Sequence, residues 1–173
     1  LLTAVTLVAC GSKKDADESI KENKKLVVAV SPDYPPFEFK TLVDGKDQVV
    51  GSDIKLAQAI ADELGVKLEV TTMSFDNVLS SLQAGKADIA ISGISVTDER
   101  KKTFDFSDPY YTSNIRLAVK KGSNIKKYED LKGKTVGAKN GTSSYSWLEE
   151  NADKYGFTLR AYDEASTMYD SLN

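Results

Sequence analysis

The sequence predicts an α/β fold in which helices cover parallel sheets, and three observations lead to this prediction. Short β-branched runs alternate with stretches of helical apolar period from residue 26 onward. Gly65 and Gly85 follow two of those stretches, and glycine is the residue that most often ends a helix. The chain has 173 residues, of which 40% are hydrophobic and 28% are charged, which suits one or two small globular domains. Such alternation favours a parallel sheet with helices on its faces.

The first predicted unit holds three strands and two helices. Ser52 or Asp53 can cap the first helix and Ser74 the second, because their side-chain oxygens accept from free N–H groups. In chain order we expect a strand at 26–30, a helix at 52–64, a strand at 66–70, a helix at 74–84 and a strand at 87–91. Ligands of such sheets bind beyond the carboxyl ends of the strands, so the loops 31–37 and 92–100 are the candidate binding loops.

A second and shorter unit follows. We expect a strand at 115–119, a short helix at 128–131, a strand at 135–138, a helix through Trp147, a strand at 158–162, and a helix that Ser166 or Thr167 opens. A unit this short, with an open sheet edge, buries little core by itself. The pattern therefore predicts a second unit that is truncated.

The N-terminal residues are typical of a processed export signal. Residues 1–9 form an apolar run too short to span a bilayer as a helix, and the chain becomes polar directly after Cys10. Residues 7–10 resemble a bacterial lipobox, in which the cysteine is lipidated. We expect a signal remnant at 1–10, a lipid anchor on Cys10 and a flexible tether at 11–25, which place the protein on the outer face of a membrane. The other interpretation is a frayed apolar end with a chance cysteine.

Composition excludes several classes of function. Histidine is absent and Cys10 is the single cysteine, which removes the Ser-His-Asp system, cysteine metal clusters and internal disulfides. The net charge is −3 and the lysines are dispersed among acids, so nucleic acid is a poor partner. We expect no cofactor and no metal.

The stretch 92–100 is the strongest candidate for ligand binding. It follows a predicted strand, Thr97 can cap a short helical turn, and Arg100 adds a guanidinium at the predicted ligand edge. A guanidinium matches a carboxylate with two parallel hydrogen bonds. The alternative is a surface arginine paired with Asp98 or Asp105.

Two further candidates lie on other loops. Residues 140–144 enter a helix, whose free N–H groups favour an anion, although plain capping by Thr142 or Ser143 needs no ligand. Tyr34 can stack on a ligand or attract an ammonium group, although it can equally pack on the neighbouring prolines. Acids at 33, 38, 98, 105 and 108 could form carboxylate pairs or a metal site, but no compact spacing supports this, and we interpret them as solvated loop acids.

An ordered series of motifs resembles the periplasmic amino-acid-binding proteins of ABC importers, from residue 26 to residue 173. The motifs are Pro-Pro-Phe-Glu-Phe at 35–39, Gly-Ser-Asp-Ile-Lys-Leu at 51–56, Leu-Gln-Ala-Gly-Lys-Ala-Asp at 82–88, Thr-Asp-Glu-Arg-Lys at 97–101, Phe-Asp-Phe-Ser-Asp-Pro-Tyr-Tyr at 104–111, Asp-Leu-Lys-Gly-Lys-Thr-Val-Gly at 130–137, and Gly-Thr at 141–142. The resemblance implies a two-lobed, type II periplasmic-binding-protein-like fold. It implies a nearly complete first lobe at 26–112, an incomplete second lobe at 113–173 and a first hinge strand near 110–115.

The resemblance also implies a function and a site. The protein would be a monomeric, non-catalytic receptor that captures a polar amino acid and delivers it to a membrane permease. Arg100 would grip the α-carboxylate, assisted by Ser95, while Ser92 and Gly93 would lie beside the α-ammonium group. The remaining implied ligand-binding residues are Tyr34, which would stack under the ligand side chain, Thr142 and Ser143 of the second lobe, Ser52, and, with weaker support, Ser31, Asp33 and Lys139.

The chain departs from the family pattern at two positions. Ser31 stands where the family often has an aspartate, and Ser52 where it often has an aromatic residue, so the resemblance does not imply a cation-selective pocket. The second-lobe acid that binds the α-ammonium group would lie beyond Asn173. Two alternatives are a dehydratase on the same scaffold, which would need an acid–base pair in the cleft, and the ligand-binding domain of a sensory receptor.

Overall fold

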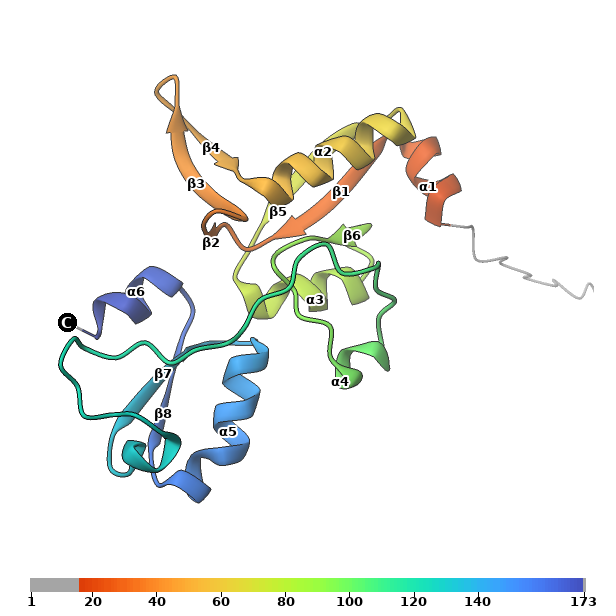
Figure 1. Ribbon diagram of the computed structural model, residues 1–173. Helices are drawn as coiled ribbons and strands as arrows, with labels where there is room; N and C mark the ends of the chain where they lie inside the picture. The colour runs from red at the N-terminus through yellow and green to blue at the C-terminus, as the bar shows by residue number, and fades with distance from the viewer. Residues whose placement is uncertain (1–15, 173) are drawn as a thin grey trace, which may run out of the picture.

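The computed structural model describes residues 16–172, which form two α/β lobes (Figure 1). The first lobe is centred on three parallel strands, β1 (Lys25–Val30), β5 (Lys67–Thr72) and β6 (Ile89–Ala90), in the order β5-β1-β6. Helices α2 (Ser52–Leu64) and α3 (Phe75–Gln83) connect the strands, and α4 (Asp98–Lys101) follows β6. The predicted parallel sheet is therefore present in this lobe.

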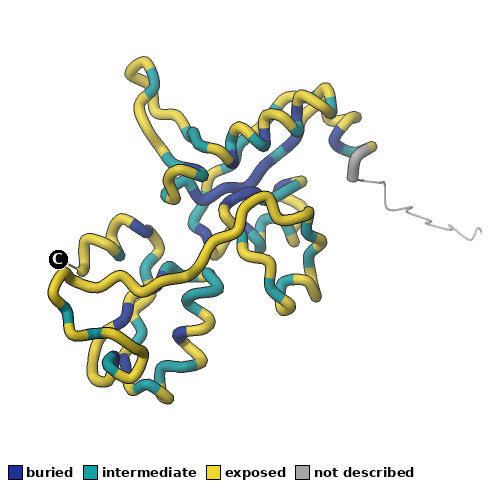
Figure 2. Tube along the Cα trace, in the orientation of Figure 1, coloured by how far each residue is buried: buried dark blue, intermediate teal, exposed yellow. Residues whose placement is uncertain are grey.

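Strand β1 is the core of the first lobe because it is buried on both faces. Leu26, Val28 and Val30 pack in a cluster with Ala57 and Ala61 of α2. The alternate position, Ala29, packs with Val78 of α3 in a second cluster. A central parallel strand covered by helices on both sides needs apolar residues at every position, which explains its unbroken apolar run. Figure 2 shows this strand as a continuous buried stretch.

An antiparallel sheet that the sequence analysis did not predict projects from this lobe. It consists of β2 (Asp33–Tyr34), β3 (Glu38–Val43) and β4 (Lys46–Val50), in the order β2-β3-β4. The hairpin turn between β3 and β4 is Asp44-Gly45, with φ values of 50° and 75°. Asp-Gly with two positive φ angles is the preferred two-residue hairpin turn, so the signal was present in the sequence.

The predicted tether is wrong for residues 16–23, which form helix α1 (Ala16–Asn23). Ile20 is 7% exposed and belongs to the core cluster beneath β1 and α2, so its burial stabilises the helix against the lobe. Cys10 and residues 11–15 lie outside the described residues. None of the helices within 16–172 has the length and apolar character needed to cross a membrane.

The second lobe contains two parallel strands, β7 (Thr135–Lys139) and β8 (Thr158–Tyr162), with helices α5 (Ser143–Tyr155) and α6 (Ala165–Asp170) and a 3₁₀ helix (Tyr128–Leu131). Its core is a separate cluster that includes Val136, Leu148 and Phe157. The helix predicted to open at Ser166 or Thr167 begins instead at Ala165.

The strand predicted at 115–119 and the hinge strand predicted near 110–115 do not form. Residues 110–122 are exposed throughout, and Figure 2 shows this segment as an exposed path between the lobes. A strand requires a neighbouring strand to satisfy its N–H and C=O groups. Within residues 16–172, none pairs with this segment.

Candidate functional site

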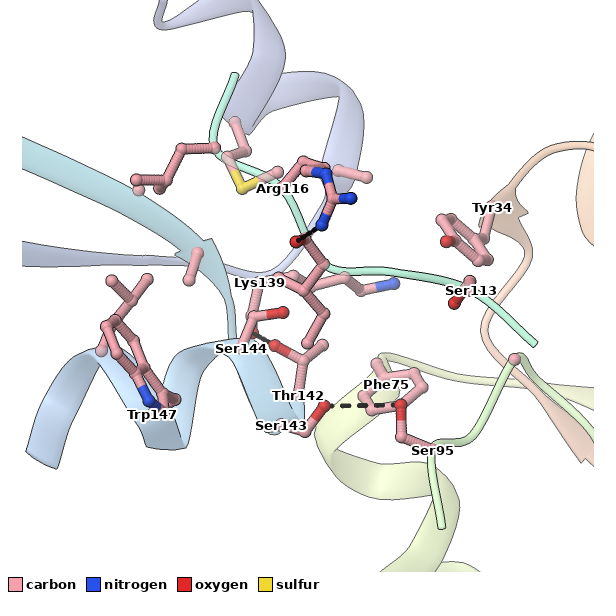
Figure 3. A pocket seen from close by; sticks show the side chains of 18 of the residues that line it. Tyr34, Phe75, Ser95, Ser113, Arg116, Lys139, Thr142, Ser143, Ser144 and Trp147 are labelled. Atoms are coloured by element: carbon pink, nitrogen blue, oxygen red, sulfur yellow. Dashed lines mark hydrogen bonds between the residues drawn. The ribbon is translucent and has the colours of Figure 1, made fainter. Parts of the chain in front are cut away.

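A cavity of about 600 Å³ lies between the two lobes. Its first-lobe lining comes from β2, β3, α3, α4 and the loop after β6, and residues 113–117 of the connecting segment contribute to it. Its second-lobe lining comes from β7, α5, α6 and the 3₁₀ helix. Figure 3 shows Tyr34 from the first lobe across from Thr142 and Ser143 of the second. The sequence predicts that a ligand binds beyond the carboxyl ends of the parallel strands, and the cavity lies at that place.

The structure brings most of the predicted site residues together. Those that line the cavity are Tyr34, Ser92, Gly93, Ser95, Arg100, Lys139, Thr142 and Ser143. Ser31 and Asp33 do not line it, but they contact Lys139, which does. Ser52 is the exception, because it is exposed on the first turn of α2 and is not part of the lining.

Arg100 is held at the boundary between the lobes. Thr97 caps α4 as predicted, since its hydroxyl accepts from the Arg100 N–H at 3.2 Å. The guanidinium donates to the carbonyl of Ser95 at 2.8 Å and to the carbonyl of Gly141 at 3.1 Å. Asp98 and Asp105 form no ion pair with it, so the surface-pair alternative does not hold. Arg100 is therefore partly exposed at the boundary, and its guanidinium bonds to one neutral carbonyl from each lobe.

Tyr34 forms one wall of the cavity. Its ring stacks on Phe37, with centroids 5.3 Å apart and planes inclined by 14°. Tyr34 as a whole is 45% exposed. Gly93 fits beneath this ring, since a Cβ there would lie 3.2 Å from two ring carbons and φ is +55°. Packing on Phe37 helps to fix the ring, and its exposed part lines the cavity.

The second-lobe wall is the N-terminus of α5. The Thr142 hydroxyl accepts from the Tyr145 N–H at 3.2 Å and donates to the Lys139 carbonyl at 2.7 Å, so it is the helix cap that the capping interpretation required. Ser143 reaches across to Ser95, with 3.4 Å between the two hydroxyl oxygens (Figure 3). The first N–H groups of any helix lack intrahelical acceptors, so this wall offers donors to an anion.

Asp33 and Lys139 join the lobes by an ion pair in which both side chains are 11% exposed. Lys139 also donates to the Ser31 hydroxyl at 2.8 Å, and the Ala165 N–H donates to the second Asp33 oxygen at 2.8 Å. The interpretation of Asp33 as a solvated loop acid is therefore wrong. Groups of the second lobe bind its carboxylate. This contact was not predictable because Lys139 lies 106 residues from Asp33 in the sequence.

Glu38 corrects a second interpretation, because it is 1% exposed rather than solvated. It lies below the cavity and accepts from the Ser92 hydroxyl at 2.6 Å. Burial is the main cause that raises the pKa of Glu38 to about 8, and the nearby charge of Asp53 raises it further. Its burial depends on β3, the unpredicted strand that turns Glu38 inward.

Phe75 also lines the cavity and was not among the predicted site residues. Its ring centroid lies 5.3 Å from the Lys139 Nζ and 5.9 Å from the Arg100 Cζ. The ring therefore shields two cations at the floor of the cavity. Its position as the first residue of a helix that follows a strand end was the available signal. No group of acidic, histidine or cysteine side chains within 16–172 is arranged to hold a metal ion.

Comparison with known proteins shows what this arrangement is similar to. The model of the family described as bacterial extracellular solute-binding proteins, family 3, matches residues 26–168. The arginine-binding extracellular protein ArtP of Bacillus subtilis is 44% identical over 96% of this chain and 63% of its own length. The L-cystine-binding protein TcyJ of Escherichia coli K12 is 41% identical over 98% of this chain and 64% of its own length. The chain thus spans less than two thirds of these relatives.

Solved structures share the fold. The substrate-binding protein AbpA of an amino acid ABC transporter from Streptococcus pneumoniae, bound to L-arginine, is 50% identical with a TM-score of 0.86, covering 90% of this chain and 65% of that one. An ancestral amino-acid-binding protein, AncCDT-1, described as a precursor of cyclohexadienyl dehydratase, is 36% identical with a TM-score of 0.80, covering 91% of this chain and 69% of that one. This agreement confirms the predicted two-lobed α/β fold.

Proposed function

The chain belongs to family 3 of the bacterial extracellular solute-binding proteins, and on this premise we propose that it captures a polar amino acid between its lobes for an ABC importer. Arg100 is the observation that carries the proposal. Its guanidinium faces the cavity, bonds to one carbonyl from each lobe and has no acid beside it. A ligand carboxylate would form stronger, charge-assisted bonds with it than these neutral carbonyls do.

The groups around Arg100 suit the rest of an α-carboxylate. Ser95 and Ser143 place hydroxyls from the two lobes within 3.4 Å of each other, and the start of α5 supplies N–H donors. A carboxylate held there would contact both lobes at once. Such a ligand binds the closed arrangement more tightly than an open one, which is the condition for a ligand to close a hinged protein.

The first lobe supports the remaining contacts of the ligand. Gly93 presents its carbonyl for the α-ammonium group, and the free face of Tyr34 stacks under the side chain. Among the described residues that line the cavity, the cations are Arg100, Arg116 and Lys139, and Glu38 is the one acid. Glu38 is buried and bonded to Ser92, and Lys139 is paired with Asp33, so these charges do not select one polar side chain. Relatives that bind arginine and L-cystine are similar to this chain.

Calorimetry of the complete protein against the twenty amino acids and cystine tests the proposal. We expect saturable one-to-one binding of at least one polar amino acid, and weak or no heat with simple carboxylates that lack an ammonium group. If no amino acid binds to folded protein, the receptor function is wrong.

We also propose that Cys10 carries a lipid that holds the receptor beside its permease, outside the cytoplasm. An anchored receptor raises its own local concentration near the transporter. The lipobox-like residues 7–10 support this, and the protein would act as a monomer. Metabolic labelling with a fatty acid should tag the protein, and Cys10→Ser should abolish the label and release the protein into the medium or periplasm.

Catalysis is the second candidate, because one similar structure is a precursor of a dehydratase and Glu38 has a raised pKa. The geometry favours binding over catalysis. Glu38 is only 1% exposed and is bonded to Ser92, so its carboxyl group faces protein rather than a substrate. Incubation with prephenate or arogenate, followed by chromatography of the products, should show no turnover above the uncatalysed rate.

A further inference from the structure

Two carboxyl side chains are buried together beneath the first-lobe wall. Glu38, the first residue of β3, is 1% exposed, and Asp53, in the first turn of α2, is 0% exposed. They come from different elements and meet under the backbone of Ser92 and Gly93, which lines the cavity. Buried acids are rare unless their oxygens are satisfied, so this pair requires a physical explanation.

The donors available to the pair satisfy only half of its oxygens. Glu38 Oε1 accepts from the Ser92 hydroxyl at 2.6 Å, and Asp53 Oδ2 accepts from the Gly93 N–H at 3.0 Å and the Tyr110 hydroxyl at 2.9 Å. Glu38 Oε2 and Asp53 Oδ1 are buried and have no donor from residues 16–172. Two ionised carboxylates would leave both oxygens unsatisfied and would also repel each other. One proton removes both costs, because a protonated carboxyl group donates to its neighbour.

We propose that the pair holds a single proton on Glu38, and that Glu38 and Asp53 together position Ser92 and Gly93 to receive the ammonium group of the ligand. This rests on the proposed amino-acid-binding function. Glu38 and Asp53 act as positioning residues, since they touch the binding loop and not the ligand.

The surroundings explain why the proton lies on Glu38. Asp53 accepts two donors at one oxygen and lies in the first turn of a 13-residue helix, where the dipole favours an anion. Glu38 accepts one donor. The other titratable groups that face Glu38 are Lys139 from β7, Tyr34 from β2 and Tyr110 from the connecting segment. Only Lys139 favours its ionised form, and Lys139 is already paired with Asp33.

The network fixes the start of the loop 92–100, directly after β6. The Ser31 N–H donates to the Ser92 oxygen at 2.9 Å, and Ser92 in turn donates to Glu38, which joins the ends of β1 and β6 to β3. Asp53 holds the next residue, Gly93. If Glu38 loses its proton, repulsion between the two carboxylates separates these anchors. Ligand affinity should therefore fall as Glu38 ionises.

Calorimetry across about pH 6 to about pH 10 tests this on the complete protein, with the amino acid that binds most tightly in the screen. The wild type should lose up to about tenfold in affinity per pH unit above the Glu38 transition. Glu38→Gln keeps a donor and an acceptor in place, so it should restore the binding that Glu38→Ala loses. It should lack the wild-type transition and show only the decline from the amino group of the ligand. Glu63→Gln, an exposed acid on α2, is the matched control.

A double-mutant cycle tests whether one proton is shared. Either amide alone, Glu38→Gln or Asp53→Asn, still supplies one donor and one acceptor between the two groups. In the double variant the NH₂ groups of the two amides face each other without an acceptor between them. We expect this variant to lose at least about tenfold more affinity than the sum of the two single losses predicts. Additive losses, or identical pH profiles for wild type and Glu38→Gln, would overturn the proposal.

An infrared measurement separates this proposal from the binding function. At neutral pH the wild type should show the C=O band of a protonated carboxylic acid, and Glu38→Gln should remove it. Absence of the band in folded protein overturns the shared proton even if amino acids bind. If the band is present but no amino acid binds, the shared proton is confirmed and the receptor function is wrong. Circular dichroism melting confirms that each variant folds.

Discussion

The two walls of the cavity are built differently. The first-lobe wall is held in place by a network of hydrogen bonds that lies beneath it. The network joins Ser31, Ser92, Glu38, Gly93, Asp53 and Tyr110. The second-lobe wall is a helix N-terminus and one lysine, whose main partners lie across the cavity on the first lobe. The first wall is therefore preorganised, whereas the second depends on closure for its contacts.

This difference indicates where binding energy acts. In the proposed receptor, a ligand at the first wall would find its donors and acceptors already fixed, so little order would be lost on contact. The second wall would add its contacts on closure, so its residues would set the closed population. Variants in the first wall should alter stability and intrinsic affinity together. Variants in the second should alter affinity with smaller effects on the folding of the first lobe.

The largest expected effect concerns stability and pH in the first wall. The pKa of Glu38 rises from its ordinary 4.5 to about 8, mainly through burial. The folded protein therefore binds this proton more tightly than the unfolded chain does, so the free energy of unfolding should fall as pH rises through that window. Relative to Glu38→Gln, the wild type should lose about 3 kcal/mol between about pH 5 and about pH 8. Urea unfolding at both pH values measures this, and parallel curves for the two proteins would contradict it.

Arg100→Ala should cost the most affinity of the direct ligand contacts. The loss of a charge-assisted pair with the carboxylate predicts a decrease of at least about 2 kcal/mol. Calorimetry with the best amino acid measures the change. Arg160→Ala, an exposed arginine on β8, serves as control and should bind as the wild type does. Unchanged affinity in the Arg100 variant would remove this residue from the site.

Lys139→Met examines the contact between the walls. Removing the ammonium group frees Asp33, whose carboxylate then becomes available to a cationic ligand side chain. We expect arginine to gain about 1.4 kcal/mol in affinity relative to glutamine. Competition calorimetry with the two amino acids gives the ratio, and Lys134→Met, at an exposed lysine directly before β7, is the matched control. A constant ratio would show that Asp33 does not reach the ligand.

Thr142→Ala should have the smallest effect. Its hydroxyl caps α5 by accepting from the Tyr145 N–H, and loss of a cap costs about 1 kcal/mol of stability. Thermal melting should show a modest decrease confined to the second lobe, and Thr142→Ser should restore most of it. If Thr142→Ala melts at the wild-type temperature while its affinity falls more than about tenfold, the hydroxyl binds the ligand and does not stabilise the helix.

Several parts of the site were predictable because their signals are local. Thr97 caps α4 and presents Arg100, since a capping hydroxyl and the helix it starts lie within three residues. Loops after β1 and β6 meet at one edge because parallel strands share a direction. The Asp44-Gly45 turn was equally local, and attention to it would have revealed β3 and the buried side of Glu38.

Other features depended on pairings that no local pattern encodes. Exposure of residues 110–122 follows from the lack of a pairing strand within the described chain, although their composition suits a strand. The same holds for Asp33, whose partner is 106 residues away. Ser52 has the same chemistry as the residues of the site, but the start of α2 leaves it exposed and away from the cavity.

The sequence by itself predicted the parallel strands and main helices of both lobes, the strand ends where the cavity lies, and Arg100 as a residue at that edge. These rest on apolar period, helix caps and strand direction, which act over a few residues. The tertiary structure alone decided which acids are buried, which cation pairs with which carboxylate, and how two lobes enclose one cavity. Burial and charge pairing depend on distances between segments that are remote in sequence, and only folding sets those distances.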